Sequence, residues 1–424
     1  MKMSSHKKII AGTIGNILEW YDFLIYGFFA AVIAKQFFPA HDEYSSLLIS
    51  LATFGVGFFT RPIGGLVIGV YADKYGRKKA LQLIIWLMFI AVTIFVVTPS
   101  YHQIGITAPI LIVIARLIQG FATGGEYASS TSYLVEGSDD NKKTFYGSWQ
   151  LFGQCLAVVL ASIISMIIFK VFNDSLESWG WRIAFAVGLV ICPVGLWIRN
   201  NLSESDEFIN QQAEKKQPGN KTGLDFRKII LGFCLVVSGT VGFYVLLINM
   251  PSFASKQLGM PITSVLTIQI CIVSLMAAII PLFGILADKI GRKFVFLIST
   301  IGYFVMVLPL FTWVIHSPTI SHMLVMQSVL GLCLAAQFAT MPTMLTLLFP
   351  VENRVTSLSI SYNLATMTFG GFSPFIVAWL SHGWGAPAPA YYMFAVSAIS
   401  LAAAICFPRD AKKALPAVAR QLSR

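Results

Sequence analysis

Five ionisable side chains interrupt long apolar stretches of this sequence, and all lie in its first third: Glu19, Asp22, Arg61, Arg116 and Glu126. A charge at the centre of a membrane helix costs about 2.5–3.5 kcal/mol on insertion scales, so each is expected to have a function. Three carboxylates against two guanidinium groups leave one carboxylate unpaired, and a desolvated carboxyl group takes up a proton readily. The pattern favours proton coupling inside a membrane, but does not show which carboxyl group is unpaired.

The composition supports a membrane location. Of the 424 residues, 56% are hydrophobic and 12% charged, whereas soluble domains carry about 25% charged residues. The mean hydropathy is +0.74. These values exclude a disordered chain and argue against a soluble enzyme. The net charge of +11 is spread too thinly through an apolar chain to indicate nucleic-acid binding.

The sequence contains no recognisable metal-binding, catalytic or nucleotide-binding motif. The six cysteines include no CxxC pair, and no histidine lies in the middle of an apolar stretch. No GxSxG, HExxH or nucleotide-binding loop occurs either. We therefore expect no metal, no cofactor and no enzymatic activity.

Twelve apolar stretches are long enough to span a membrane, in two groups of six. The first group is 9–38, 45–71, 80–99, 108–135, 144–172 and 182–199, and the second is 228–254, 262–287, 294–315, 321–349, 355–381 and 390–407. This predicts an all-α membrane protein of 12 transmembrane helices in two pseudo-symmetric six-helix bundles. The bundles would comprise residues 1–199 and 228–424, joined by a cytoplasmic linker at 200–227, with a short tail at the end.

The basic residues fix the orientation of these spans. With both termini in the cytoplasm, 24 of the 30 Lys and Arg residues fall on the cytoplasmic side and four on the outer side. Basic residues accumulate in cytoplasmic loops. We expect a multi-pass protein of the bacterial inner membrane.

Two loops of the sequence repeat each other at equivalent places in the two groups. One contains Gly69, Asp73, Gly76 and Arg77, and the other contains Asp288, Gly291 and Arg292. Glycine allows a tight turn, and Asp can pair with Arg or cap a neighbouring helix. We interpret the loops as a cytoplasmic gate that latches the halves together; the alternative is that the basic residues only anchor the topology.

These loops resemble the signature of the major facilitator superfamily. Further runs resemble the metabolite:proton symporter family: Gly15–Phe23, Arg61–Gly65, Arg116–Tyr127, Ser148–Gln150, Trp179–Arg182 and Phe369–Pro374. The segment Ser359–Ala365 is most similar to the citrate and tricarballylate branch. The resemblance covers nearly the whole chain and implies two halves that rock around a central cavity.

The resemblance also implies residue roles. In proton-coupled sugar symporters of the superfamily an Asp in the first helix pairs with an Arg in the fourth, and Asp22 and Arg116 hold similar positions. They are the predicted coupling pair, with Glu19 and Glu126 nearby. Arg61 and Glu126 would line the cavity or form a second pair. The alternative is that these charges only hold the helices together.

Neutral polar side chains complete the predicted substrate site. Asn16 and Tyr26 share a helix face with Glu19. Gln150 and Gln154 lie one turn apart, and could either bind a carboxylated substrate or join helices. The second half offers only hydrogen-bonding groups at this depth, among them Asn249, Gln337, Tyr362 and Asn363.

The leading functional hypothesis is a proton symporter that imports a small organic anion, because arginine binds carboxylates bidentately. The resemblance implies citrate or a related tricarboxylate as the narrowest reading. A zwitterionic osmolyte such as proline or betaine is the main alternative, and a dicarboxylate such as 2-oxoglutarate is another. The osmolyte reading ranks second because osmosensing relatives carry a C-terminal coiled coil, which we do not expect here. The expected partners are substrate, protons and the lipid bilayer, with no nucleic acid, and we expect a monomer.

Overall fold

The computed structural model describes residues 5–39, 43–136, 138–139, 141–172, 175–200 and 223–408, and within these ranges the chain is helical with no strand. The predicted linker lies mostly outside this part of the chain, as does the tail after residue 408. The division into domains at 200–227 stays a prediction.

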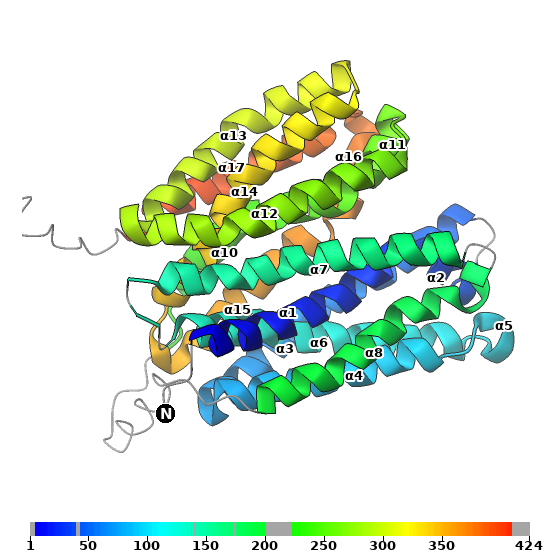
Figure 1. Ribbon diagram of the computed structural model, residues 1–424, viewed down its shortest axis with the longest axis horizontal. Coiled ribbons are helices and arrows are strands. Elements are labelled where there is room, and N and C mark those ends of the chain that lie inside the picture. The colour runs from blue at the N-terminus through cyan, green and yellow to red at the C-terminus, as the bar shows by residue number, and fades with distance from the viewer. Residues whose placement is uncertain are drawn as a thin grey trace, which may run out of the picture.

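Helices of the N-terminal half form the lower group in Figure 1. They are α1 (Ser5–Phe28), α2 (Ala30–Phe37), α3 (Glu43–Tyr75), α4 (Arg77–Val97), α5 (Tyr101–Ile104), α6 (Thr107–Val135), α7 (Lys143–Val171), the π-helix η2 (Leu176–Gly180) and α8 (Trp181–Asn200). Within this half, α3 packs along α6, and α1 packs along α7.

Most helices of the C-terminal half form the upper group in Figure 1, whereas α15 (Arg354–Ala365) is drawn beside α1 and α3. The helices of this half are α10 (Phe226–Gly242), the π-helix η3 (Phe243–Asn249), α11 (Met250–Leu258), α12 (Ile262–Ile290), α13 (Arg292–His316), α14 (Ile320–Leu348), the 3₁₀-helix η4 (Val351–Asn353), α15, the π-helix η5 (Thr366–Gly371), α16 (Ser373–Trp384) and α17 (Ala388–Cys406). The halves meet where α7 packs on α12 and α3 packs on α15.

Ten helical segments of the described chain are long and apolar enough to cross a membrane. The two other predicted spans are interrupted helices. The chain of 9–38 changes from α1 to α2 at Phe29, and that of 355–381 passes through η5 between α15 and α16. The predicted all-α, two-bundle fold is confirmed, and the interruptions refine it. Single π-turns are frequent at functional sites.

The interruption at η5 brings backbone close to the other half. A Cβ built on Gly371 would lie 2.4 Å from the Phe58 ring, so only glycine fits there without a shift. The contact places η5 directly against α3, where the buried Arg61 also lies.

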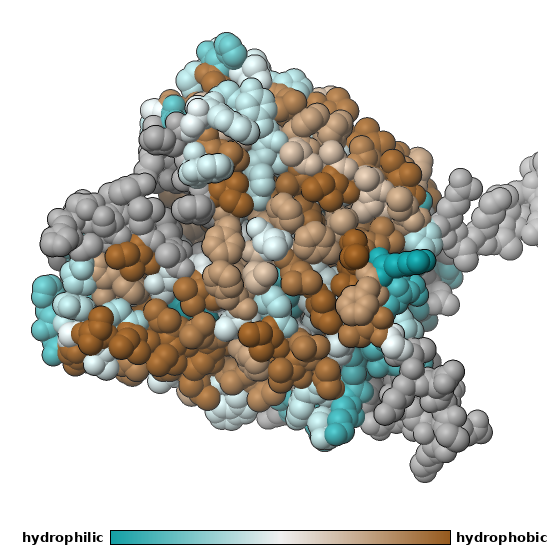
Figure 2. Space-filling model, turned by 180° about the vertical axis from the view of Figure 1, so that it is seen from behind, coloured by the Kyte–Doolittle hydropathy of each residue, from teal (hydrophilic) through white to brown (hydrophobic). Residues whose placement is uncertain are grey.

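The outer surface is apolar, as a lipid-facing surface must be. Figure 2 shows hydrophobic residues spread over one face, with hydrophilic residues gathered towards its edges. On α3 an exposed stripe at helical spacing consists of Phe59, Ile63, Val67 and Val70. The opposite face of α3 carries Arg61 into the protein.

Candidate functional site

Arg61 of α3 lies completely buried in a group of aromatic rings. Its Cζ is 4.2 Å from the ring centroid of Phe58, 4.7 Å from that of Phe23 and 5.4 Å from that of Trp20. Such cation–π contacts are strongest when desolvated. None of the three guanidinium nitrogens has a hydrogen-bond partner among the described residues. A buried guanidinium with free donors is suited to take the carboxylate of a ligand.

Arg116 of α6 is equally buried and shares one of these rings. Its Cζ lies 4.5 Å from the Phe23 ring and 4.2 Å from the Tyr26 ring, and its Nη1 donates to Gln119 Oε1 at 2.8 Å. Phe23 therefore contacts both membrane arginines. The Tyr26 hydroxyl donates to the Ser50 carbonyl at 3.1 Å, which ties α1 to α3.

Asp22 is buried on α1, and its carboxyl group points towards α8. Its Oδ1 has no hydrogen-bond partner among the described residues. A Cβ built on Gly188 of α8 would lie 2.0 Å from this oxygen, so the carboxyl group packs on that glycine. Asp22 makes no ion pair with Arg116 in this conformation, and their coupling role stays a prediction.

The other predicted polar residues of the N-terminal half lie around this group. Glu19 and Glu126 are buried on α1 and α6. Asn16 Nδ2 donates to the Gln150 carbonyl at 2.7 Å, and Gln150 Oε1 accepts from Ser130 Oγ at 2.8 Å. Asn16 and Gln150 therefore join α1, α6 and α7, which is the interhelical role left open by the sequence.

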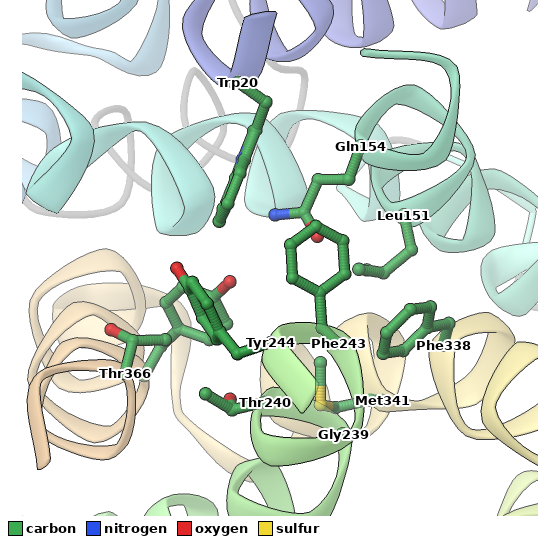
Figure 3. A pocket seen from close by; sticks show the side chains of 11 residues that line it. Trp20, Leu151, Gln154, Gly239, Thr240, Phe243, Tyr244, Phe338, Met341 and Thr366 are labelled. Carbon is green, nitrogen blue, oxygen red and sulfur yellow. The ribbon is translucent and has the colours of Figure 1, made fainter. Parts of the chain in front are cut away.

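A small cavity lies between the two halves next to this group (Figure 3). Its lining from the N-terminal half is Trp20, Leu151 and Gln154, and from the C-terminal half Gly239, Thr240, Phe243, Tyr244, Phe338, Met341, Tyr362 and Thr366. Gln154 reaches into it with a buried Nε2 that has no partner among the described residues. The lining is aromatic and polar, and none of its members is charged.

Trp20 connects the cavity to Arg61. Its ring lines the cavity and meets the Phe243 ring edge-to-face at 5.3 Å. A second contact is made by Phe58, which also surrounds Arg61: its ring meets the Tyr244 ring of the cavity edge-to-face at 5.8 Å. The aromatic groups that hold Arg61 thus continue directly into the wall of the cavity.

The structure brings only part of the predicted substrate site to the cavity. Gln154 and Tyr362 line it, whereas Asn249 lies half-buried at the end of η3 and Gln337 lies buried on α14. Asn363 donates through Nδ2 to the Gly124 carbonyl at 2.6 Å and so joins α15 to α6.

Sequence reasoning missed the aromatic lining. Trp20, Phe243 and Phe338 of the lining were not assigned to the site, and neither were Phe23 and Phe58, whose rings contact Arg61. One signal was present: Trp20 and Phe23 alternate with the two carboxylates of α1 in a single run.

The first repeated loop joins the two halves at their cytoplasmic ends. Asp73 Oδ2 accepts from Thr356 N at 3.0 Å and from Thr356 Oγ1 at 2.7 Å, at the start of α15. Arg77 Nη2 pairs with Asp73 at 3.4 Å and with Glu136 at 3.1 Å. Arg354 Nη1 reaches the same Glu136 oxygen at 3.1 Å. Sequence reasoning missed Glu136, Thr356 and Arg354.

The second repeated loop makes the equivalent contact in the opposite direction, from the C-terminal half to the N-terminal half. Asp288 accepts from the backbone N–H groups of Thr144 at 3.0 Å and Phe145 at 2.9 Å, at the start of α7. Arg292 pairs with Asp288 at 3.6 Å and donates to Thr144 Oγ1 at 2.8 Å. Each loop aspartate thus sits at the positive N-terminus of a helix from the opposite half.

Glycines permit both loops. Gly76 and Gly291 share a φ of 107°, which side chains rarely adopt. A Cβ built on Gly69 would lie 3.0 Å from Thr356 Cα, so that glycine allows α3 and α15 to touch. The interhalf contacts fit the latch interpretation, and its gating role stays a prediction.

Comparison with known families decides the class of the chain. The family described as "Sugar (and other) transporter" matches residues 8–222, and the family described as "Major Facilitator Superfamily" matches residues 233–422. The chain belongs to the major facilitator superfamily. It is therefore a multi-pass membrane transporter, and the predicted location in the cell membrane is confirmed.

Relatives of this facilitator with similar sequences are named as proline/betaine transporters. A Staphylococcus aureus (strain COL) protein named "Putative proline/betaine transporter" is 36% identical over 401 residues, covering 93% of this chain and 86% of the relative. The Escherichia coli (strain K12) "Proline/betaine transporter" is 33% identical over 425 residues, covering 96% and 84%. These relatives correct the placement in a citrate and tricarballylate branch, which they do not support.

Solved structures of the xylose symporter XylE have the same fold as this chain. The proton:xylose symporter XylE bound to 6-bromo-6-deoxy-D-glucose matches with a TM-score of 0.80 at 18% identity, covering 95% of this chain and 94% of that one. A structure titled as the inward open conformation of XylE from E. coli scores 0.67, at 18% identity, with coverage of 96% and 97%. Both matches show the fold of the chain.

Proposed function

We propose that this facilitator is a proton symporter that imports a zwitterionic osmolyte of the proline and betaine class. The observation that carries the proposal is the position of Arg61 behind the aromatic wall of a cavity that has no charged lining. The names of the relatives point to the same substrates.

The chemistry of the site fits both ends of a zwitterion. The guanidinium donors of Arg61 make no hydrogen bond of normal length to the described residues, so they can bind a carboxylate through two parallel hydrogen bonds. Aromatic faces attract quaternary ammonium groups through cation–π contacts. Trp20 contacts both Arg61 and the cavity, so it can bring the two ends of a short zwitterion together.

A tricarboxylate fits the same site poorly. Burying three negative charges requires three compensating cations or protons. The cavity lining supplies none, and Arg61 and Arg116 are the two arginines buried at membrane depth in the described chain. A zwitterion carries its own compensating charge, so one arginine suffices.

Proton coupling would use the carboxyl group of Asp22. This group is buried and its Oδ1 has no hydrogen-bond partner in the described part of the chain, an environment that a neutral carboxyl group tolerates better than a carboxylate. Opening of the cytoplasmic loops would then release substrate and proton on the inside by alternating access.

Uptake into proteoliposomes tests the proposal. A pH gradient, acidic outside, should drive accumulation of labelled betaine or proline, and a proton ionophore should abolish it. Arg61→Lys keeps the positive charge but loses the paired N–H donors of the guanidinium. It should therefore raise the substrate concentration for half-maximal uptake by about tenfold. Gradient-driven uptake of citrate or 2-oxoglutarate in place of both zwitterions would contradict the proposal.

A further inference from the structure

The phenyl ring of Phe23 is shared by the two arginines buried at membrane depth. The guanidinium carbon of Arg61 lies 4.7 Å from its centroid, and that of Arg116 lies 4.5 Å away. The ring is itself buried and is held edge-to-face by Phe58 at 5.1 Å and by Trp20 at 6.0 Å. The ring therefore has little freedom to move away from either cation.

This arrangement places two like charges close together in a medium of low dielectric. The guanidinium groups are near enough to repel each other, and such repulsion is weakly screened inside a protein. The negative face of an aromatic ring offsets part of this cost for each cation. Removal of the ring would leave the repulsion in place.

Each arginine also has an anion that competes with the ring. For Arg61 it is the substrate carboxylate of the proposed function. For Arg116 it is the carboxylate of Asp22, the residue directly before Phe23. In this conformation Asp22 packs on Gly188, and Arg116 contacts the two rings and Gln119. This is the arrangement expected when Asp22 is protonated and neutral.

We propose that Phe23 is a positioning residue that couples substrate binding at Arg61 to protonation at Asp22. When a carboxylate draws Arg61 from the ring, the repulsion on Arg116 falls and the ring is free to hold Arg116 alone. Arg116 then stays away from Asp22, which keeps its proton until the halves reorient. This inference rests on the proposed function of the same site.

The test compares three variants with the wild type in proteoliposomes. Phe23→Leu removes the ring, whereas Phe23→Tyr retains it. Phe185→Leu is the matched control, because Phe185 is equally buried and stacks on Phe95 at 5.0 Å without contacting an arginine. Two rates are measured for labelled betaine: accumulation driven by a pH gradient, and exchange against internal unlabelled betaine without a gradient.

Phe23→Leu should lower the accumulation ratio by about tenfold while exchange stays within about threefold of the wild type. Phe23→Tyr and Phe185→Leu should behave like the wild type in the ratio of the two rates. Unchanged accumulation in Phe23→Leu, or equal loss of exchange and accumulation, would overturn the inference. A wild type that accumulates neither betaine nor proline removes the proposed function, and the coupling role falls with it.

Discussion

The phenol rings of Tyr127 and Tyr362 lie parallel across the boundary between the halves, with centroids 3.6 Å apart and an interplanar angle of 2°. Tyr362 also lines the cavity, and its neighbour Asn363 bonds the Gly124 carbonyl of α6. The stack therefore lies between the cavity and the contacts of the cytoplasmic loops. We therefore expect the stack to obstruct passage from the cavity to the cytoplasm.

Loss of this stack should favour the inward-open conformation. An aromatic pair contributes about 0.5–1.5 kcal/mol, so Tyr127→Ala should shift the equilibrium between the two conformations by about two- to tenfold. Spin labels on the cytoplasmic ends of α6 and α15 would report the shift as a larger population of long distances. Tyr127→Phe keeps the stack and serves as the control; an equal shift in both variants would show that stacking is not the cause.

Glu136 should be the most sensitive residue of the cytoplasmic contacts. It is buried and pairs with both Arg77 and Arg354. Glu136→Gln leaves two buried arginines without this charge, and breaking a buried pair costs about 3–5 kcal/mol. The cytoplasm-closed conformation should therefore be depopulated, which the same spin-label distances would show.

An exposed ion pair on the non-cytoplasmic side supplies a matched control for that prediction. Glu177 pairs with Lys35 at 2.9 Å, but the side chains are 60% and 48% exposed. Exposed pairs contribute about 0–1 kcal/mol. Glu177→Gln should leave both the distances and transport unchanged, and a conformational shift as large as that of Glu136→Gln would contradict the role of burial.

The sequence predicted the fold well because its two signals are strong. Apolar length and the asymmetry of basic residues are imposed by the bilayer itself. The breaks at Phe29 and at the π-helix η5 were missed because neither changes the length of the apolar stretch. The loop contacts were predicted from the repeat, although their partners Glu136 and Thr356 lie far from it in sequence.

The site was predicted in its charged members and in Gln154 and Tyr362, but not in most of its aromatic rings. Arg61 and Arg116 stand out in an apolar sequence, whereas Trp20 and Phe243 do not, because aromatic residues are common in membrane helices for other reasons. The branch was placed wrongly because it was chosen from one short segment, Ser359–Ala365. In the structure Tyr362 of this segment lines the cavity, whereas its neighbour Asn363 joins helices.

Asp22 offers a direct test of the coupling site. Asp22→Asn keeps the shape of the side chain but cannot exchange a proton. Accumulation driven by a pH gradient should be lost, while exchange of labelled for unlabelled betaine should persist. Uphill accumulation equal to that of the wild type would assign the coupling proton to another group.

Gly188 tests the same carboxyl group from the opposite helix. A Cβ at residue 188 would lie 2.0 Å from Asp22 Oδ1, so Gly188→Ala must displace the carboxyl group from α8. Displacement brings it out of the site in which we propose that it is neutral, and coupled accumulation should fall by about tenfold with a smaller effect on exchange. Gly55→Ala on α3 is the control, because nothing lies within 4 Å of the added carbon. If Gly188→Ala accumulates betaine as Gly55→Ala does, the packing of Asp22 on α8 has no part in coupling.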